Sequence, residues 1–175
     1  MKIRFFTHTA MLLTLAGLIS CQKMDTFHEI VEPAISENVN DFFQTHFSGF
    51  INPIHEHFFG DNKVGHESSK CILINSKEEF EKHISDSSIE LPEIDFNQYT
   101  LIVGRHHMIY RTTKYVIVEQ KIVSKRKKLE LNMTVERPDF AFTASMMFYY
   151  WGMYPKLPSK PVHVNADIRI IEDLR

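Results

Sequence analysis

The sequence has little of the features that most directly reveal a function. Its 175 residues include only two cysteines, and its 20 basic and 22 acidic side chains nearly balance. This charge balance gives no electrostatic reason to expect nucleic acid as a partner. The chain has no low-complexity tract and no internal repeat, and it lacks the GxSxG and HExxH motifs. The sequence therefore lacks the motif typical of many serine hydrolases and the motif typical of many zinc hydrolases.

The apolar run over residues 10–19 is too short to cross a membrane as a helix. It holds about ten residues, whereas a spanning helix needs about 20. Lys2 and Arg4 precede it. A basic segment followed by an apolar run of this length is typical of a secretory signal peptide. We expect residues 1–20 to be a signal peptide that the mature protein lacks.

The end of this run, Leu-Ile-Ser-Cys at residues 18–21, resembles the lipobox of bacterial lipoproteins. In that family the cysteine receives diacylglycerol, the peptide bond before it is cut, and the new amino terminus is acylated. The resemblance implies lipidation of Cys21. Two or more acyl chains hold a protein stably on a membrane without a spanning helix. The alternative is an ordinary signal peptide, with Cys21 as a thiol near the cleavage point.

The residues that follow Cys21 indicate where the protein is delivered. Position 22 lacks the aspartate that retains enteric lipoproteins in the inner membrane, so the resemblance implies the outer membrane. Gln22, Lys23 and Asp25 are similar to a short signal that exports some lipoproteins to the cell surface. Only one acidic residue precedes Thr26, so a surface-exposed domain and a periplasm-facing domain both remain open.

Cys71 is the only cysteine left if Cys21 carries lipid, so no intramolecular disulfide can form. Residues 71–74 read Cys-Ile-Leu-Ile, which is typical of a buried strand. We interpret Cys71 as a small buried apolar side chain, the usual role of a free cysteine. A catalytic thiol is the alternative.

The mature chain predicts a single α+β domain over residues 33–175, joined to the lipidated cysteine by a tether over residues 21–32. Residues 33–69 form a helical and loop-rich part, and residues 70–172 form a β-rich core. The length suits one ordinary domain with a core of its own.

Two helices are predicted in this domain. The first covers residues 33–47, with Pro33 in its first turn and apolar side chains at helical spacing. The second covers about residues 76–85, where Ser76 and Glu79 form the pattern of a capping box. The apolar side chains of the first helix are Ile35, Val39, Phe42, Phe43 and Phe47.

The chain after Tyr99 predicts a mainly antiparallel sheet of about five strands. Residues 129–136 alternate apolar and polar side chains, as in a strand with one buried face. No helix-length segment separates the strands, which favours antiparallel pairing of successive strands. The basic residues 125–128 predict a solvated turn, and contact with phosphate or lipid head groups is the alternative. The strands begin near residue 100 and cover about 115–123, 129–136, 145–153 and 162–171.

Five short segments occur in a fixed order between residues 70 and 170. They are Ile74-Asn75-Ser76, Glu78-Glu79-Phe80, Leu91-Pro92-Glu93-Ile94-Asp95-Phe96, Leu101-Ile102-Val103-Gly104 and Tyr154-Pro155-Lys156. Their order and the Pro-x-x-Asp-Phe core resemble the PrcB-like domain, a small β-rich domain of bacterial envelope proteins. The resemblance implies an accessory or binding domain. Members of that family often have a Thr-Gly-Gly turn where this chain has residues 105–113, so no role of that turn carries over.

Four of the ten histidines suggest a metal site as one alternative function. His55 and His57 would project to one side of an extended segment, and His106 and His107 lie at a predicted strand end. Imidazole is a common ligand of zinc. However, no cysteine or carboxylate lies at a diagnostic spacing, so we interpret these residues as surface histidines and predict no cofactor.

Aromatic side chains are unusually dense over residues 148–154. Phe148, Tyr149, Tyr150 and Trp151 put rings on both faces of one strand. One face should pack in the core. The other face either packs against residues 33–59 or forms an exposed binding face, in which Tyr150, Trp151 and Tyr154 would contact a peptide or glycan.

These patterns together predict a non-enzymatic, lipid-anchored protein of the outer membrane whose domain engages another envelope protein. A surface lipoprotein that binds glycan or peptide through residues 148–154 is the second hypothesis. A metal-dependent hydrolase that uses the four histidines is the third.

Overall fold

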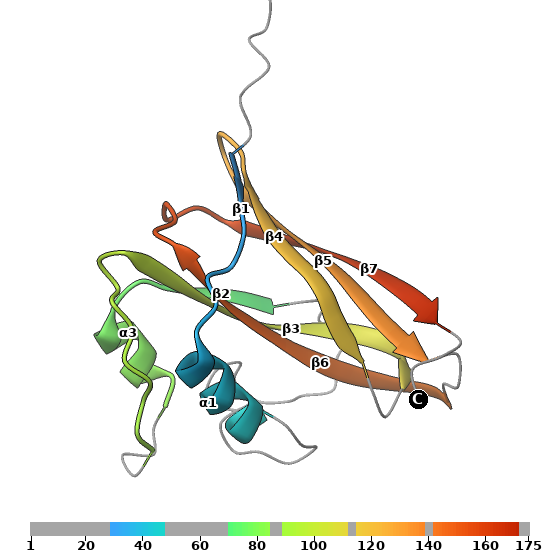
Figure 1. The fold of residues 1–175 in the computed structure, drawn as a ribbon. Coiled ribbons are helices and arrows are strands. Elements are labelled where there is room, and N and C mark those ends of the chain that lie inside the picture. Colours follow the sequence, from blue (N-terminus) through green and yellow to red (C-terminus); the bar gives the residue numbers. More distant parts are fainter. Residues whose placement is uncertain (1–28, 48–69, 85–88, 112–114, 139–141, 172–175) are drawn as a thin grey trace, which may run out of the picture.

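Two β-sheets packed face to face, with two helices on the outer side of one of them, form the fold (Figure 1). The computed structural model describes residues 29–47, 70–84, 89–111, 115–138 and 142–171. The helices are α1 (Glu37–Phe47) and α3 (Lys77–Lys82). The strands are β1 (Glu29–Val31), β2 (Lys70–Ile74), β3 (Tyr99–Arg111), β4 (Val116–Ser124), β5 (Leu129–Pro138), β6 (Phe142–Pro155) and β7 (Val162–Ile171).

One sheet has the strand order β1-β4-β5-β7, and the other has the order β2-β3-β6. Every pair of neighbouring strands is antiparallel except β5 and β7, which are parallel. After β5 the chain crosses to the three-stranded sheet as β6 and then returns to the four-stranded sheet as β7. The α+β class and the mainly antiparallel pairing are therefore confirmed, whereas one sheet of about five strands is wrong, because the described residues form seven strands in two sheets.

The side chains of β6 explain why the chain crosses to the three-stranded sheet between β5 and β7. A strand next to β5 in a half-solvated sheet would need one polar face, but β6 carries rings on both faces. The three-stranded sheet lies between the four-stranded sheet and the helices, so both faces of β6 are covered there. On one face, Phe148, Tyr150 and Tyr154 pack on the four-stranded sheet. On the other face, Tyr149, Trp151 and Met153 pack under the helices. The strand that follows then pairs beside β5.

The core between the two sheets is built from the alternating strand pattern that the sequence predicts. Leu129, Leu131, Met133 and Val135 are all buried and face the three-stranded sheet. The polar residues between them lie on the outer face of the four-stranded sheet. This periodicity explains why β5 can occupy the centre of a sheet that has water on one side.

The second core lies between the helices and the three-stranded sheet. The ring of Phe43 on α1 stacks on Trp151 at 5.5 Å between centroids, and Phe47 meets Tyr149 edge to face at 5.5 Å. Phe80 of α3 completes this layer and is buried. The apolar faces of the two helices therefore cover a sheet face that would otherwise expose aromatic rings.

Helix α1 begins later than the sequence predicts. Residues 33–36 are not helical, and the Ala34 N–H donates to the Met153 carbonyl at 2.6 Å. This bridge and the pairing of β1 with β4 hold the preceding chain extended. Ile35, which was expected on the buried helical face, is 92% exposed.

Helix α3 confirms the predicted cap. The Glu79 N–H donates to Ser76 Oγ at 3.1 Å, and Glu79 Oε2 accepts from the Asn75 N–H at 2.7 Å. The helix ends at Lys82, three residues before the predicted end, because the N–H groups of His83 and Ile84 form tighter three-residue bonds. These two hydrogen bonds account for Glu79 as a capping residue.

Candidate functional site

Three of the five segments that carry the family resemblance meet at one corner of the molecule. Lys156, which follows β6, donates from Nζ to the carbonyl of Asn75 at 3.1 Å and to the carbonyl of Phe96 at 2.5 Å. Its N–H donates to the Gln98 carbonyl at 2.7 Å. One lysine thus ties the end of β2, the segment before β3 and the end of β6 together.

Thr100 extends this network into the core. Its hydroxyl donates to Asn75 Oδ1 at 2.7 Å and accepts from the Leu157 N–H at 3.0 Å. Thr100 has no exposed surface, so these bonds satisfy a polar group that would otherwise be costly to bury. The corner fixes the start of α3 relative to the chain that leads into β3.

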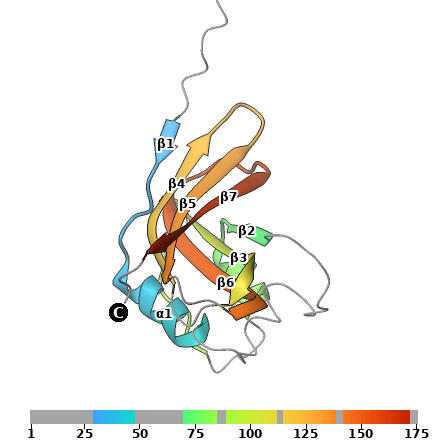
Figure 2. The same ribbon diagram turned by 90° about the vertical axis from the view of Figure 1, so that its right-hand side faces the viewer.

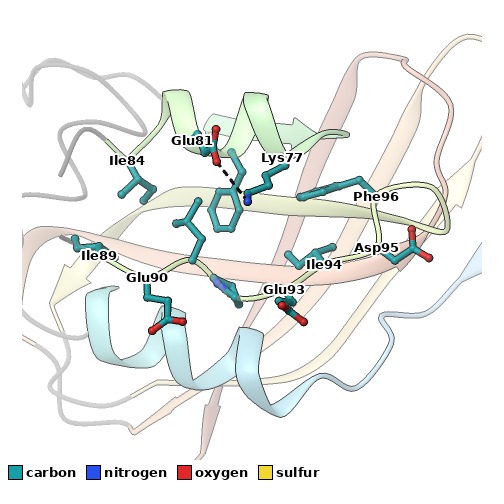
Figure 3. A pocket seen from close by; sticks show the side chains of 12 residues that line it. Lys77, Glu81, Ile84, Ile89, Glu90, Glu93, Ile94, Asp95 and Phe96 are labelled. Carbon is teal, nitrogen blue, oxygen red and sulfur yellow. Dashed lines mark ion pairs between the residues drawn. The ribbon is translucent and has the colours of Figure 1, made fainter. Parts of the chain in front are cut away.

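A cleft of about 1010 Å³ opens next to this corner, between α3 and residues 89–96. Figure 3 shows Lys77 and Glu81 on the α3 side and residues 89–96 along the other side. The lining residues are Lys77, Phe80, Glu81, Ile84, Ile89, Glu90, Leu91, Pro92, Glu93, Ile94, Asp95 and Phe96. None of the sequence motifs above predicted a site here.

The floor of the cleft is apolar. Phe80 is 1% exposed and Ile84 is 8% exposed, and both belong to the core under the helices. The ring of Phe96 lies edge to face with Phe80 at 6.5 Å between centroids. A side chain that entered the cleft would therefore meet hydrocarbon and ring edges at its base.

The rim of the cleft is acidic. Glu81, Glu90, Glu93 and Asp95 line it, against a single cation, Lys77. Lys77 Nζ lies 3.7 Å from Glu81 Oε1, and both side chains are more than half exposed, so this ion pair is largely screened by water. The cleft therefore combines an apolar base with a negatively charged edge.

A sequence signal for this cleft exists in residues 89–96. Apolar and acidic side chains alternate there, except at Pro92. In an extended segment such alternation turns apolar groups inward and carboxylates outward, and the exposed residues of the segment are Glu90, Glu93 and Asp95. The pattern was readable, but the opposite wall depends on α3 packing alongside it.

Asp95 has a structural role at the edge of the cleft. Its carboxylate accepts from the Asn97 N–H at 3.0 Å and from Gln98 Nε2 at 2.7 Å. These hydrogen bonds lower the pKa of Asp95, so it stays ionised at the edge of the cleft at neutral pH. It closes a turn and contributes charge.

The four histidines proposed as metal ligands are not brought together by anything described. His55 and His57 lie outside the described residues. His106 and His107 are consecutive on β3, so their side chains point to opposite faces of the sheet, and His106 packs on Phe148 at 5.2 Å. Burial, and then the neighbouring His107, lower the pKa of His106. Within the described ranges, no three His, Cys, Asp or Glu side chains are grouped to hold a metal.

The proposed aromatic binding face is occupied by the protein itself. Tyr150 and Tyr154 have no exposed surface. Trp151 is partly buried, stacks on Phe43 and donates from Nε1 to Asn40 Oδ1 at 3.1 Å. Tyr150 and Tyr154 are therefore closed to a glycan or peptide, and the packing of Trp151 against α1 accounts for the second aromatic face.

Cys71 lies partly buried on β2 against the core between the sheets. Desolvation raises the pKa of its thiol to about 12, against a smaller lowering by a hydrogen bond with Tyr150. A thiol with that pKa is almost fully protonated at neutral pH, so it is a poor nucleophile. This supports the interpretation of Cys71 as a packing residue.

Alkylation of Cys71 should therefore be slow in the folded protein. At pH 8 we expect iodoacetamide to modify it on the order of a thousandfold more slowly than in urea, because the thiolate is the reacting form. The rate should rise with pH across the alkaline range below pH 12. Mass mapping of the Cys71 peptide measures this without interference from Cys21, and equal rates in buffer and urea would refute it.

None of the helices in the described ranges is long and apolar enough to span a bilayer. Comparison of the chain with family models, with curated proteins and with solved structures gives no match. The fold and the cleft are therefore the features from which a function can be inferred.

Proposed function

We propose that this chain is a lipid-anchored protein of the bacterial cell envelope whose domain binds another envelope protein and catalyses no reaction. The observation that carries the binding role is the cleft between α3 and residues 89–96. The lipobox ending at Cys21 supports the anchor and, by resemblance, the outer membrane. The corner at Lys156, where the PrcB-like segments meet, supports an accessory role.

The chemistry of the cleft defines the partner segment. The apolar base set by Phe80 and Phe96 accepts an aliphatic or aromatic side chain. The carboxylates of Glu90 and Glu93 favour basic groups on either side of it, since complementary charge speeds encounter and rejects acidic partners. The partner segment therefore carries an apolar residue flanked by lysine or arginine.

Site-specific photo-crosslinking in the native host tests this function. A photoreactive residue at Lys77, on the cleft, should yield a discrete adduct, whereas the same residue at Asn165, on the outer face of the four-stranded sheet, should not. Glu90→Lys/Glu93→Lys should reduce the adduct about fivefold, because two rim charges together contribute about 1 kcal/mol.

Matching adducts from the two probe positions would contradict a role for the cleft, as would an adduct unchanged by the charge reversal. Glu136→Lys provides the control for the charge change, since Glu136 lies on β5 away from the cleft. It should leave the Lys77 adduct at its full level.

A further inference from the structure

The turn between β4 and β5 concentrates positive charge at one end of the molecule. The Lys125 N–H donates to the Lys128 carbonyl at 2.9 Å and closes the turn, so Arg126 and Lys127 form its tip. Lys160, from the loop before β7, donates from Nζ to the Lys125 carbonyl at 2.8 Å. Five cations therefore lie together at this end, because Lys160 joins the four that are consecutive in the sequence.

One carboxylate, Glu130, neutralises part of this charge. Glu130 Oε2 lies 2.5 Å from Lys125 Nζ, and Glu130 Oε1 lies 2.7 Å from Lys128 Nζ. Both hydrogen-bonded lysines lower the pKa of Glu130 to about 2, so it is ionised at neutral pH. Among the described residues, Arg126 and Lys127 make no ion pair, and both are exposed. Within the part of the chain that the structure describes, the tip thus presents two unpaired cations to solvent.

The chain from the expected lipid anchor enters the domain beside this turn. Glu29 of β1 pairs with Ser124, the residue before Lys125. Cys21 and Glu29 are eight residues apart, and a fully extended chain covers at most about 3.5 Å per residue, so the two lie within about 28 Å whatever path the chain takes. In Figures 1 and 2, β1 and the turn lie at the same end, and the helices lie at the other.

We propose that this basic turn, residues 125–128 with Lys160, rests on the membrane surface and binds the phosphate groups of anionic lipids, which orients the tethered domain. The inference depends on the proposed anchor at Cys21 for its setting. A short tether forces some part of the domain to face the bilayer, and the end where the tether enters is the one that carries the cations.

The electrostatics of a membrane surface make this contact effective. Each lysine or arginine near an anionic bilayer strengthens binding about fivefold, and an acyl anchor together with a basic patch is a stable combination. Because the potential decays over about 10 Å at 0.1 M salt, only groups close to the lipid contribute. With the turn on the bilayer, α1 and α3 face away from it, and the cleft is open to a partner.

Sedimentation with lipid vesicles tests the proposal. The protein is the mature chain from residue 21 with Cys21→Ser, so that no acyl chain contributes. The vesicles contain equal parts of phosphatidylglycerol and phosphatidylcholine, and a second set contains phosphatidylcholine alone. We expect binding to the anionic vesicles, loss of binding at ~0.5 M salt and no binding to the neutral ones.

Two variants with equal charge locate the contact. Arg126→Gln/Lys127→Gln should weaken binding to anionic vesicles about 25-fold, at about fivefold per cation. Lys77→Gln/Lys82→Gln removes two cations from α3, at the other end, and should change binding less than twofold. Circular dichroism confirms that both variants fold as the parent does.

Equal weakening by the two variants would overturn the proposal, because binding would then follow net charge and not the turn. Equal binding of the parent to neutral and anionic vesicles would also overturn it. The intact mass of Cys21 in the native host is measured separately. If Cys21 carries lipid but the protein does not bind vesicles, the contact between the basic turn and the membrane is rejected and the proposed anchor at Cys21 is retained.

Discussion

Replacing Gly104 with alanine is expected to lower the free energy of unfolding by about 3 kcal/mol, the upper end of what an overpacked core costs. For a chain of this size that corresponds to a drop in melting temperature of about 10 °C. The reason is that a single cross-strand pair, Gly104 on β3 and Tyr150 on β6, leaves no room for a methyl group.

The ring of Tyr150 lies directly over Gly104. A Cβ at position 104 would come 2.0 Å from Tyr150 Cζ and 2.2 Å from its hydroxyl oxygen, far inside contact distance. The ring cannot swing away freely, because Tyr150 has no exposed surface and its hydroxyl donates to the Lys70 carbonyl at 3.2 Å. An aromatic ring that covers a strand glycine is a recurrent way to pin strand register.

Gly152→Ala is the matched control, since it adds the same methyl group to a buried glycine in the same sheet. There the new Cβ would lie 2.9 Å from Gln120 Nε2, the end of a flexible side chain, and 2.9 Å from Tyr154 Cε2. We expect a loss of about 1 kcal/mol. Thermal unfolding followed by circular dichroism measures both variants, and a Gly104→Ala protein as stable as Gly152→Ala would show that Tyr150 can move.

The alternation of apolar and polar side chains accounts for most of the fold that could be predicted from the sequence. Alternation over residues 129–136 identified both the strand and its buried face, and residues 162–171 were assigned as a strand with the bounds that β7 has. The Ser76 cap located the start of α3. These features depend on neighbours in the sequence, which is why local patterns revealed them.

The features that the sequence did not reveal depend on partners far along the chain. Strand β1 has three residues and no periodicity, and it exists because β4 has an edge for it to pair with. The parallel pairing of β5 with β7 follows from where β6 packs. Helix α1 starts at Glu37 because the chain before it is bridged to Met153.

In the candidate site too, local motifs could be recognised in the sequence, whereas contacts between distant segments could not. The segments around Asn75, Phe96 and Lys156 were noticed as motifs, but only folding brings Lys156 Nζ to the carbonyls of the other two. The cleft needs both α3 and residues 89–96, and neither half alone forms a depression. The aromatic residues 148–154 gave a strong signal, and in the structure it corresponds to a strand that packs on both faces, with Tyr150 and Tyr154 fully buried and Trp151 partly buried against α1.

Replacing Cys21 with alanine is expected to abolish the proposed membrane anchor. The wild-type mature protein should begin at Cys21 and carry the mass of its acyl chains, and the variant should carry none. Each buried methylene contributes about 0.8 kcal/mol, and two or more chains make attachment effectively stable, whereas the apolar run before Cys21 is too short to span a bilayer. Intact mass and incorporation of labelled fatty acid measure the difference.

Cys71→Ala provides the control, because it removes the other cysteine and leaves the lipobox-like residues 18–21 unchanged. Its thiol is partly buried against the core and strongly protonated, so it offers no competing acylation site. Labelled fatty acid should therefore persist in Cys71→Ala and vanish in Cys21→Ala. An unmodified Cys21 in the wild-type protein would reject the anchor, and the basic turn at residues 125–128 would then have to hold the domain on anionic lipid by charge alone, an attachment that rising salt removes.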